Sequence, residues 1–163
     1  MLDYAVIVRG TPPLPSSAQL RAFEKELGFT LPNDYFQFLL ATNGGKVTRE
    51  HQIPLQALGE DTCVDYFYPL SVASPSIGLI ERRQIQMTFR QGLRPSLIIG
   101  DDMGPGVFFL VLAGQQKGSV CFCFKDEIPT CECDWYTEAI RIPEEMEIVC
   151  DSFSGLCKLI LGL

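Results

Sequence analysis

The stretch from residue 16 to residue 45 constrains the fold most, because it reads as two consecutive helices with marked ends. Ser16 and Gln19 have the spacing of a capping box, which pairs the free backbone amides at a helix start. Three apolar residues then recur on one stripe of this first helix: Leu20, Phe23 and Leu27. Gly28 follows and can adopt the left-handed conformation that ends a helix. The sequence therefore predicts an amphipathic helix with one buried face.

A second helix is predicted to open at Pro32, since proline is favoured in the first turn. One face of this helix carries four residues: Tyr35, Phe38, Leu39 and Thr42. Phe36 and Leu40 lie on another face. The helix ends at an Asn-Gly-Gly sequence, residues 43–45, whose members tolerate positive φ. Because its apolar surface has two sides, we expect the helix to pack between two other elements.

This pattern resembles the SUKH superfamily, the Smi/Knr-like group that includes a fungal cell-wall regulator and many bacterial immunity proteins. The family motif Phe-Glu-x-x-Leu-Gly occurs at residues 23–28, Leu-Pro-x-Asp-Tyr-x-x-Phe-Leu at 31–39, and Asn-Gly-Gly at 43–45. The resemblance implies that these positions form the scaffold, so that their substitution would unfold the protein. Nine such residues are Leu31, Pro32, Asp34, Tyr35, Phe38, Leu39, Asn43, Gly44 and Gly45.

Two weaker matches follow in the family's order, so the resemblance extends over roughly residues 16–161. Residues 98–106 resemble an Ile-Gly-Asp-x-Gly turn, and Ser152-Phe153 with the apolar residues after it resembles a closing helix. The strand at residues 120–127 departs from the family pattern, because it has neither the Trp nor the His often found at its end. A function carried by those side chains in relatives is not transferred to this chain.

The order of elements predicts an α+β fold, a single SUKH-like domain over residues 1–163. Beyond the first two helices, Ser74-Pro75 marks a helix reaching Gly92, and Asp151-Ser152 caps a closing helix. Strands are predicted at residues 53–55, 64–70, 97–99, 107–112, 119–124 and 135–142. In the second of these, Val64, Tyr66 and Tyr68 alternate with Asp65 and Phe67. Short glycine-bearing joints make neighbouring strands antiparallel, which gives a mostly antiparallel sheet of about five or six strands with about four helices.

Composition and apolar runs favour a soluble protein. Its 163 residues are 47% hydrophobic and 20% charged, which is ordinary for a globular domain. The longest apolar run, residues 107–113, is too short to span a membrane. The chain begins without a basic start followed by an apolar stretch, so we expect no cleaved secretion signal and a cytoplasmic location.

The negative charge is concentrated in one segment. Residues 119–151 carry nine acidic and two basic side chains, a charge of −7 that equals the formal net charge of the protein. Acidic surface can serve solubility alone, or it can attract a basic protein partner. It disfavours nucleic acid, whose phosphates need clustered Lys and Arg. The partner-binding candidates are Asp101, Asp102, Asp126, Glu127, Glu132, Asp134, Tyr136 and Glu138, with Trp135 as a further aromatic anchor or a core residue.

No catalytic arrangement stands out in the sequence. His51 is the only histidine and lies in a polar stretch, so we interpret it as an exposed loop residue. Asp101 and Asp102 are adjacent, and neighbouring side chains in an extended segment point apart. The turn after them has neither calcium-loop nor phosphate-loop spacing. We therefore expect a protein without enzymatic activity and without a cofactor.

The seven cysteines leave one alternative open. Cys121 and Cys123 form one Cys-x-Cys, Cys131 and Cys133 form another, and four thiolates could hold a zinc ion. Residues two apart in a strand lie about 7 Å apart, which is too far for two ligands of one ion without a bend. Reduced thiols, with Phe122 and Phe124 in the core of a sheet, are the favoured interpretation.

The resemblance supplies the function that no chemical motif provides. Bacterial members of the family commonly act as immunity proteins, which bind and neutralise a cognate toxin domain, often a basic nuclease. The acidic segment fits such a partner by charge. The alternative from the same family is a regulatory adaptor that binds host proteins without a toxin. A zinc-stabilised module and an enzyme remain further alternatives, and the latter would need a deep polar pocket.

Overall fold

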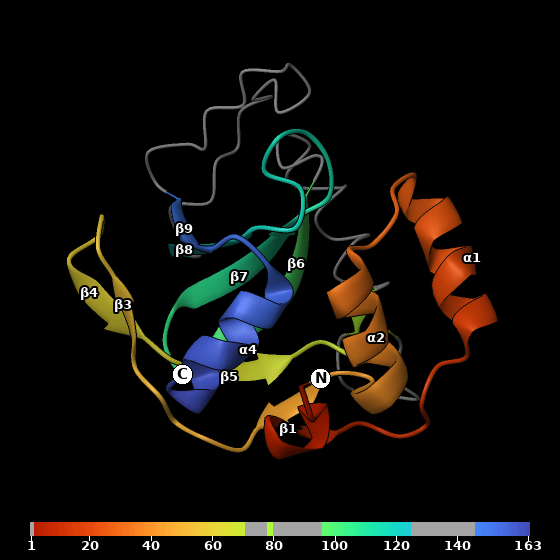
Figure 1. Ribbon diagram of the computed structural model, residues 1–163, viewed down its shortest axis with the longest axis horizontal. Coiled ribbons are helices and arrows are strands. Elements are labelled where there is room, and N and C mark those ends of the chain that lie inside the picture. Colours follow the sequence, from red (N-terminus) through yellow and green to blue (C-terminus); the bar gives the residue numbers. More distant parts are fainter. Residues whose placement is uncertain (1, 71–77, 80–95, 125–145) are drawn as a thin grey trace.

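A seven-stranded antiparallel sheet forms the frame of the protein (Figure 1). The computed structural model describes residues 2–70, 78–79, 96–124 and 146–163. The strands of this sheet are β1 (Val8–Gly10), β2 (Gly45–Val47), β5 (Val64–Phe67), β6 (Ser96–Asp102), β7 (Gly106–Val111), β8 (Val120–Phe124) and β9 (Glu147–Cys150). Their spatial order is β1-β2-β5-β6-β7-β8-β9, and each neighbouring pair is antiparallel. The predicted α+β class is confirmed, with more strands in the sheet than expected.

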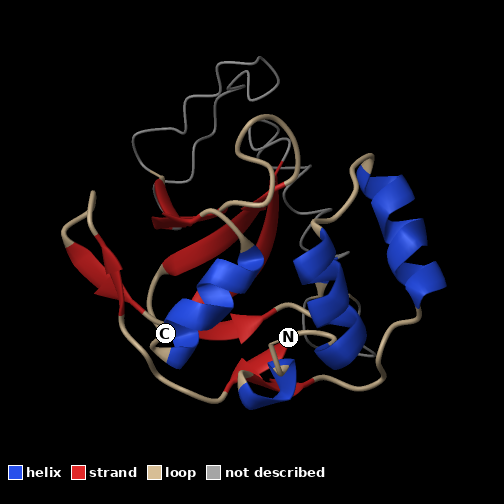
Figure 2. Cartoon of the chain, in the orientation of Figure 1, coloured by secondary structure: helices blue, strands red, loops and turns tan. Residues whose placement is uncertain are grey.

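The remaining described elements are a separate hairpin and the helices (Figure 2). The hairpin consists of β3 (Ile53–Leu55) and β4 (Glu60–Thr62). The helices are the 3-10 helix η1 (Tyr4–Val6), α1 (Ser17–Leu27), α2 (Asn33–Thr42) and α4 (Phe153–Leu161). The predicted helix at 74–92 lies outside the described residues except near Leu79, which is helical, and the predicted strand at 135–142 lies outside them entirely. No helix within the described ranges combines the length and apolar character needed to cross a membrane.

The helix ends follow the expected side-chain chemistry. Ser16 Oγ accepts from the Gln19 backbone N–H at 3.2 Å, and Gln19 Oε1 accepts from the Ser16 backbone N–H at 2.8 Å, which completes the capping box. Gly28 ends α1 with φ of 78°. Ser152 Oγ accepts from the Gly155 backbone N–H at 3.1 Å and caps α4. All three predicted signals are confirmed.

Two helices pack on one face of the sheet through a cluster of aromatic rings. The ring centroids of Phe38 in α2 and Phe153 in α4 lie 4.7 Å apart, and each lies within 5.4 Å of Phe67 in β5. Tyr35 adds an edge-to-face contact with Phe153 at 4.8 Å. These four side chains are 0% exposed, so they form the centre of the core.

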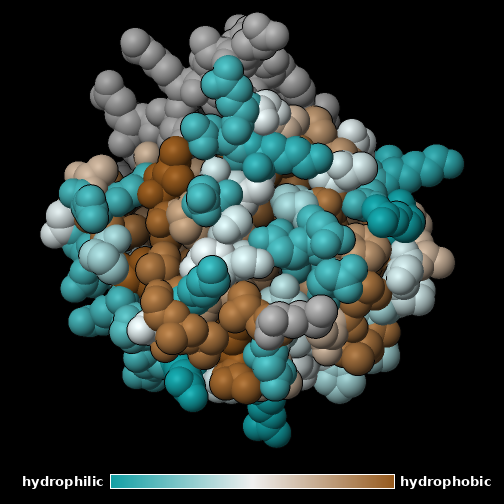
Figure 3. Space-filling model, viewed as in Figure 1, coloured by the Kyte–Doolittle hydropathy of each residue, from teal (hydrophilic) through white to brown (hydrophobic). Residues whose placement is uncertain are grey.

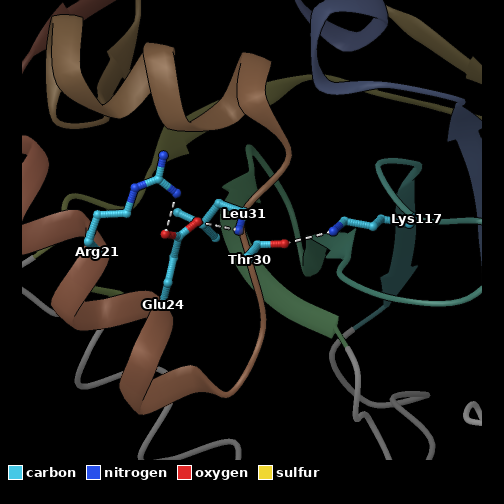
Figure 4. Close-up of polar contacts among 5 residues, drawn as sticks. All are labelled: Arg21, Glu24, Thr30, Leu31 and Lys117. Atoms are coloured by element: carbon cyan, nitrogen blue, oxygen red, sulfur yellow. Dashed lines mark hydrogen bonds and ion pairs between the residues drawn. The ribbon is translucent and has the colours of Figure 1, made fainter.

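The second apolar side of α2 faces α1, as its two-sided pattern predicts. Phe36 is buried there, with the guanidinium of Arg21 placed 4.4 Å from its ring centroid. The neighbouring carboxylate of Glu24 accepts from the Leu31 backbone N–H at 2.7 Å and from Arg21 at 2.7 Å (Figure 4). Glu24 thereby closes the connection between α1 and α2 from a position that is only 6% exposed. Lys117 Nζ donates to Thr30 Oγ1 at 2.8 Å and ties the β7–β8 loop to the same connection.

Asn43 joins three distant parts of the chain where α2 ends. Its backbone adopts a left-handed conformation with φ of 53°. Its side-chain Nδ2 donates to the carbonyls of Thr11 at 3.0 Å and Pro13 at 2.9 Å, and Oδ1 accepts from the Leu70 backbone N–H at 2.9 Å. The residue is 2% exposed, so these bonds satisfy polar groups that have little access to water.

Gly44 and Gly45 let two strands approach this junction closely. Both have positive φ, 67° and 129°. A Cβ added to Gly44 would lie less than 3.0 Å from the Phe67 carbonyl oxygen, and one added to Gly45 would lie less than 3.0 Å from that of Arg9. A side chain at either position would therefore collide with the backbone of β5 or β1, the two neighbours of β2.

The alternation predicted for β5 is wrong, and the strands at the two edges of the sheet were not predicted. Val64 and Phe67 are the buried residues of β5, because the register shifts between Val64 and Tyr66. Such an irregularity moves the following side chains to the other face. β1, β2, β4 and β9 were not predicted; they are three or four residues long and have no clear alternation.

The Asn-Gly-Gly junction gives a matched pair of glycine substitutions. Gly45→Ala should lower the free energy of unfolding by about 3 kcal/mol or more, because the backbone of β1 or β2 must move. Gly28→Ala also places a side chain at positive φ, but an added Cβ there has nothing within 4 Å. It should cost only about 1 kcal/mol. Urea unfolding of both variants measures the difference, and equal losses would contradict the close approach at Gly45.

Candidate functional site

Two of the eight predicted binding residues are described, and both lie at the end of β6. Asp101 and Asp102 occupy the last positions of this strand, just before its turn into β7. The other six lie outside the described residues: Asp126, Glu127, Glu132, Asp134, Tyr136 and Glu138. Trp135 lies outside them too. The site is therefore built from the β6–β7 turn and what surrounds it.

Asp102 organises the turn itself. Its Oδ1 accepts from the backbone N–H of Gly104 at 2.9 Å and of Gly106 at 2.7 Å. Its Oδ2 accepts from the hydroxyl of Thr62 in β4 at 3.3 Å. At Gly106 an added Cβ would lie less than 3.0 Å from the Phe122 ring, so the turn packs directly against the core. The carboxylate proposed for binding is thus first a structural acceptor.

Asp101 precedes Asp102 within β6. It is half-buried and pairs in register with Tyr66 on one side and Val107 on the other. Consecutive strand residues point to opposite faces of a sheet. The expectation that the two side chains diverge fits this extended backbone.

A cleft of about 270 Å³, here called the turn cleft, separates the turn from the hairpin. One wall consists of residues 60–63 at the end of the hairpin, and the other of turn residues 102–105. Phe122, which is fully buried, and Phe124, which is half-buried, close its base, and Gln52 contributes at its edge. The cleft therefore combines acidic walls with an aromatic base.

Backbone and side-chain bonds hold both walls in place. The Met103 backbone N–H donates to the Cys63 carbonyl at 3.1 Å, directly across the base of the turn. At the far end of the hairpin, Glu147 Oε2 accepts from the backbone N–H of Ala57 at 3.0 Å and of Leu58 at 3.1 Å. A cleft fixed at both ends loses little conformational entropy when a ligand enters.

Electrostatics in the turn cleft are negative. Burial raises the pKa of the half-buried Cys63 thiol, and three neighbouring carboxylates raise it further: Glu50, Asp102 and Asp61. Glu60 and Asp61 are exposed on the hairpin wall. Neither residue was among the predicted binding candidates, because both lie about 40 positions before the turn and only the fold brings them to it. The only feature of Glu60 and Asp61 that the sequence itself shows is that they are adjacent acidic residues.

Comparison with protein-family models shows which family this chain belongs to. The model of the SMI1 / KNR4 family (SUKH-1) matches residues 14–157. This chain belongs to the SMI1/KNR4 family. Comparison with curated proteins gives no match. The matched range includes both walls of the turn cleft, so the cleft lies within the SUKH domain.

The thiols of the SUKH domain that the structure describes are mostly buried. Cys121 and Cys123 are 0% exposed in β8, where burial raises the pKa of Cys121 to about 12. Burial likewise raises the pKa of Cys150 to about 11 and of Cys157 to about 12. Among described residues, no three His, Cys, Asp or Glu side chains are grouped for a metal. The other proposed zinc ligands, Cys131 and Cys133, lie outside that part of the chain.

A second hollow of about 800 Å³, here called the helix groove, lies between η1, α2 and α4. Asp34 helps to build it, since its Oδ2 accepts from the Ser154 backbone N–H at 2.8 Å and its carbonyl accepts from the Tyr4 hydroxyl at 3.2 Å. The lining is largely apolar, with Lys158 at one side. In Figure 3, brown apolar side chains gather on the lower part of this face, where η1 and the end of α4 lie.

The reactivity of Cys63 tests the field in the turn cleft. Because the thiolate is the nucleophile, a raised pKa means that alkylation of Cys63 reaches half its maximal rate above about pH 8.5, the ordinary thiol value. Asp61→Asn removes one of the carboxylates that raise the pKa, so the midpoint should move to lower pH. Glu26→Gln, an exposed site on α1, should leave it unchanged.

Site-resolved mass spectrometry of iodoacetamide adducts follows Cys63 alone. A midpoint at or below the ordinary thiol value, or one that Asp61→Asn does not move, would contradict the negative field.

Proposed function

We propose that this SUKH domain is a non-catalytic immunity protein that binds and neutralises a basic toxin domain, most suitably a nuclease. The observation that carries the proposal is the turn cleft, a fixed hollow whose acidic walls meet at an exposed turn. Family membership supports protein binding as the general role. An inhibitor of this kind needs a complementary surface and no catalytic group.

Charge supports a basic partner. Asp61 and Asp102 lie on opposite walls of the turn cleft, and Glu60 extends the acidic edge. A nuclease is basic because its substrate is polyanionic, so an acidic inhibitor presents the charge that the toxin surface is built to meet. Complementary charge also speeds capture, which matters when a toxin must be bound before it reaches its target.

Met103 supplies an apolar contact on the turn wall of the cleft. It lies in the β6–β7 turn and its side chain is 58% exposed, although the backbone beneath it is fixed. Interfaces draw most of their energy from a few well-packed anchors within a polar rim. Methionine adapts its shape to a partner surface. Met103 is thus suited to pack against an apolar part of the toxin at the turn cleft.

The second candidate function is a regulatory adaptor, and the helix groove is the observation that favours it. The groove is larger than the turn cleft and has Leu2, Ala5 and Ala41 among its lining residues. Its charged residues are of both signs, two aspartates and Lys158, whereas those of the turn cleft are all acidic. A host protein that inserts apolar side chains there would bind with little dependence on salt. The two candidate functions therefore place the partner at different surfaces of the domain, and they predict binding with different dependence on ionic strength.

Capture from the native host tests the proposal. The tagged protein is purified at low salt, washed at high salt, and the released proteins are identified by mass spectrometry. We expect a basic toxin domain in the high-salt fraction. The double variant Glu60→Gln/Asp61→Asn should retain about fivefold less of it, since two exposed charge pairs contribute about 1 kcal/mol together.

A matched variant controls for net charge alone. Glu26→Gln/Asp151→Asn changes the charge equally at exposed positions that do not line the turn cleft, so it should retain the wild-type amount. Host regulatory proteins that stay bound at high salt would favour the adaptor. Equal losses in both double variants would contradict a role for the cleft itself.

A further inference from the structure

The size of the turn cleft restricts what can enter it. A volume of about 270 Å³ admits one long side chain. A helix, about 10 Å wide, is too large to enter. The occupant is thus a single group that projects from a larger partner.

The carboxylates of Glu60 and Asp61 lack a compensating charge in the described part of the chain. Neither has a hydrogen bond or ion pair there, whereas Asp65 is paired with Lys46. None of the described basic residues lines the turn cleft. Opposite them, Asp102 Oδ2 has only the long 3.3 Å bond to Thr62, and a carboxylate oxygen can accept more than one. The walls thus offer acceptors to an incoming cation.

The base of the cleft selects the shape of that cation. Phe122 and Phe124 form an edge-to-face pair with centroids 5.2 Å apart and planes at 86°. Because Phe122 is buried and Phe124 is half-buried, the Phe124 ring is the one available to a ligand. A guanidinium is planar, stacks on aromatic rings, and donates two parallel hydrogen bonds to a carboxylate. An ammonium group carries the same charge but is not planar.

We infer that the turn cleft is a binding site for one arginine side chain, which the partner inserts between the hairpin and the β6–β7 turn. The guanidinium stacks on Phe124 and donates to the carboxylates of Asp61 and Asp102, while Met103 covers its aliphatic stem. The inference deepens the proposed function and rests on it for the partner's identity as a basic protein. Burial raises the pKa of the Cys63 thiol on the hairpin wall, and Asp102 and Asp61 are also among the carboxylates that raise it further.

A peptide titration tests the site without the partner. The probe is acetyl-Gly-Arg-Gly-amide, added to ¹⁵N-labelled protein while the backbone amides are followed by NMR. We expect saturable shifts at Cys63, Gly104 and Gly106, with millimolar affinity. The citrulline peptide, which keeps the shape but lacks the charge, should bind at least fivefold more weakly, and the lysine peptide at least threefold more weakly.

Two variants assign the contacts. Asp61→Asn and Phe124→Leu should each weaken the arginine peptide at least threefold, whereas Glu26→Gln should not. The amide spectrum of each variant shows whether it remains folded. Equal binding of arginine and citrulline peptides, or shifts that neither variant changes, would overturn the arginine site.

Failure of this inference is distinguishable from failure of the proposed function. If the peptide does not bind while a basic toxin is still captured in a salt-dependent way, the arginine site is wrong and the immunity function stands. If the peptide binds as expected and only regulatory proteins are captured, the arginine site stands with a different partner.

Discussion

The left-handed backbone at Asn43 is the constraint on which the rest of the structure depends. It ends α2 and turns the chain into β2, where glycines allow β1 and β5 to approach from both sides. The side-chain amide of Asn43 joins the segment before α1 to the chain just after β5. One buried side chain therefore aligns the helices with the sheet. On the helix that Asn43 ends, Phe38 packs with Phe153 against Phe67.

The position of the turn cleft also depends on this junction, through a series of paired strands. β5 is placed by β2 and in turn places β6, whose last residue, Asp102, forms the turn. The hairpin is then held against that turn by a backbone bond and, at its other end, by Glu147. Within the described part of the chain, the acids on the two cleft walls line one hollow without an ion-pair partner. Like charges that share a hollow repel one another, and a basic group from the proposed partner would relieve that repulsion.

Local chemistry could be predicted from the sequence, and long-range juxtaposition could not. The caps at Ser16 and Ser152 and the Asn-Gly-Gly junction follow from side chains within a few residues of each other. β1 and β9 are strands because segments elsewhere in the chain pair with them. With only three or four residues each, they have no sequence pattern that predicts a strand. The irregularity in β5 reverses its alternation for the same reason. At the site, the resemblance of residues 98–106 to an Ile-Gly-Asp-x-Gly turn indicated a turn, whereas the approach of Glu60 and Asp61 depended on the tertiary fold.

Hydrogen–deuterium exchange of the domain, free and bound to its captured partner, tests most directly the claim that the turn cleft is the binding surface. We expect slower exchange in the complex for the amides of residues 60–63, Met103, Gly104 and Gly106, with little change across η1 and α4. Protection confined to η1, α2 and α4 would place the partner in the helix groove and contradict binding at the turn cleft.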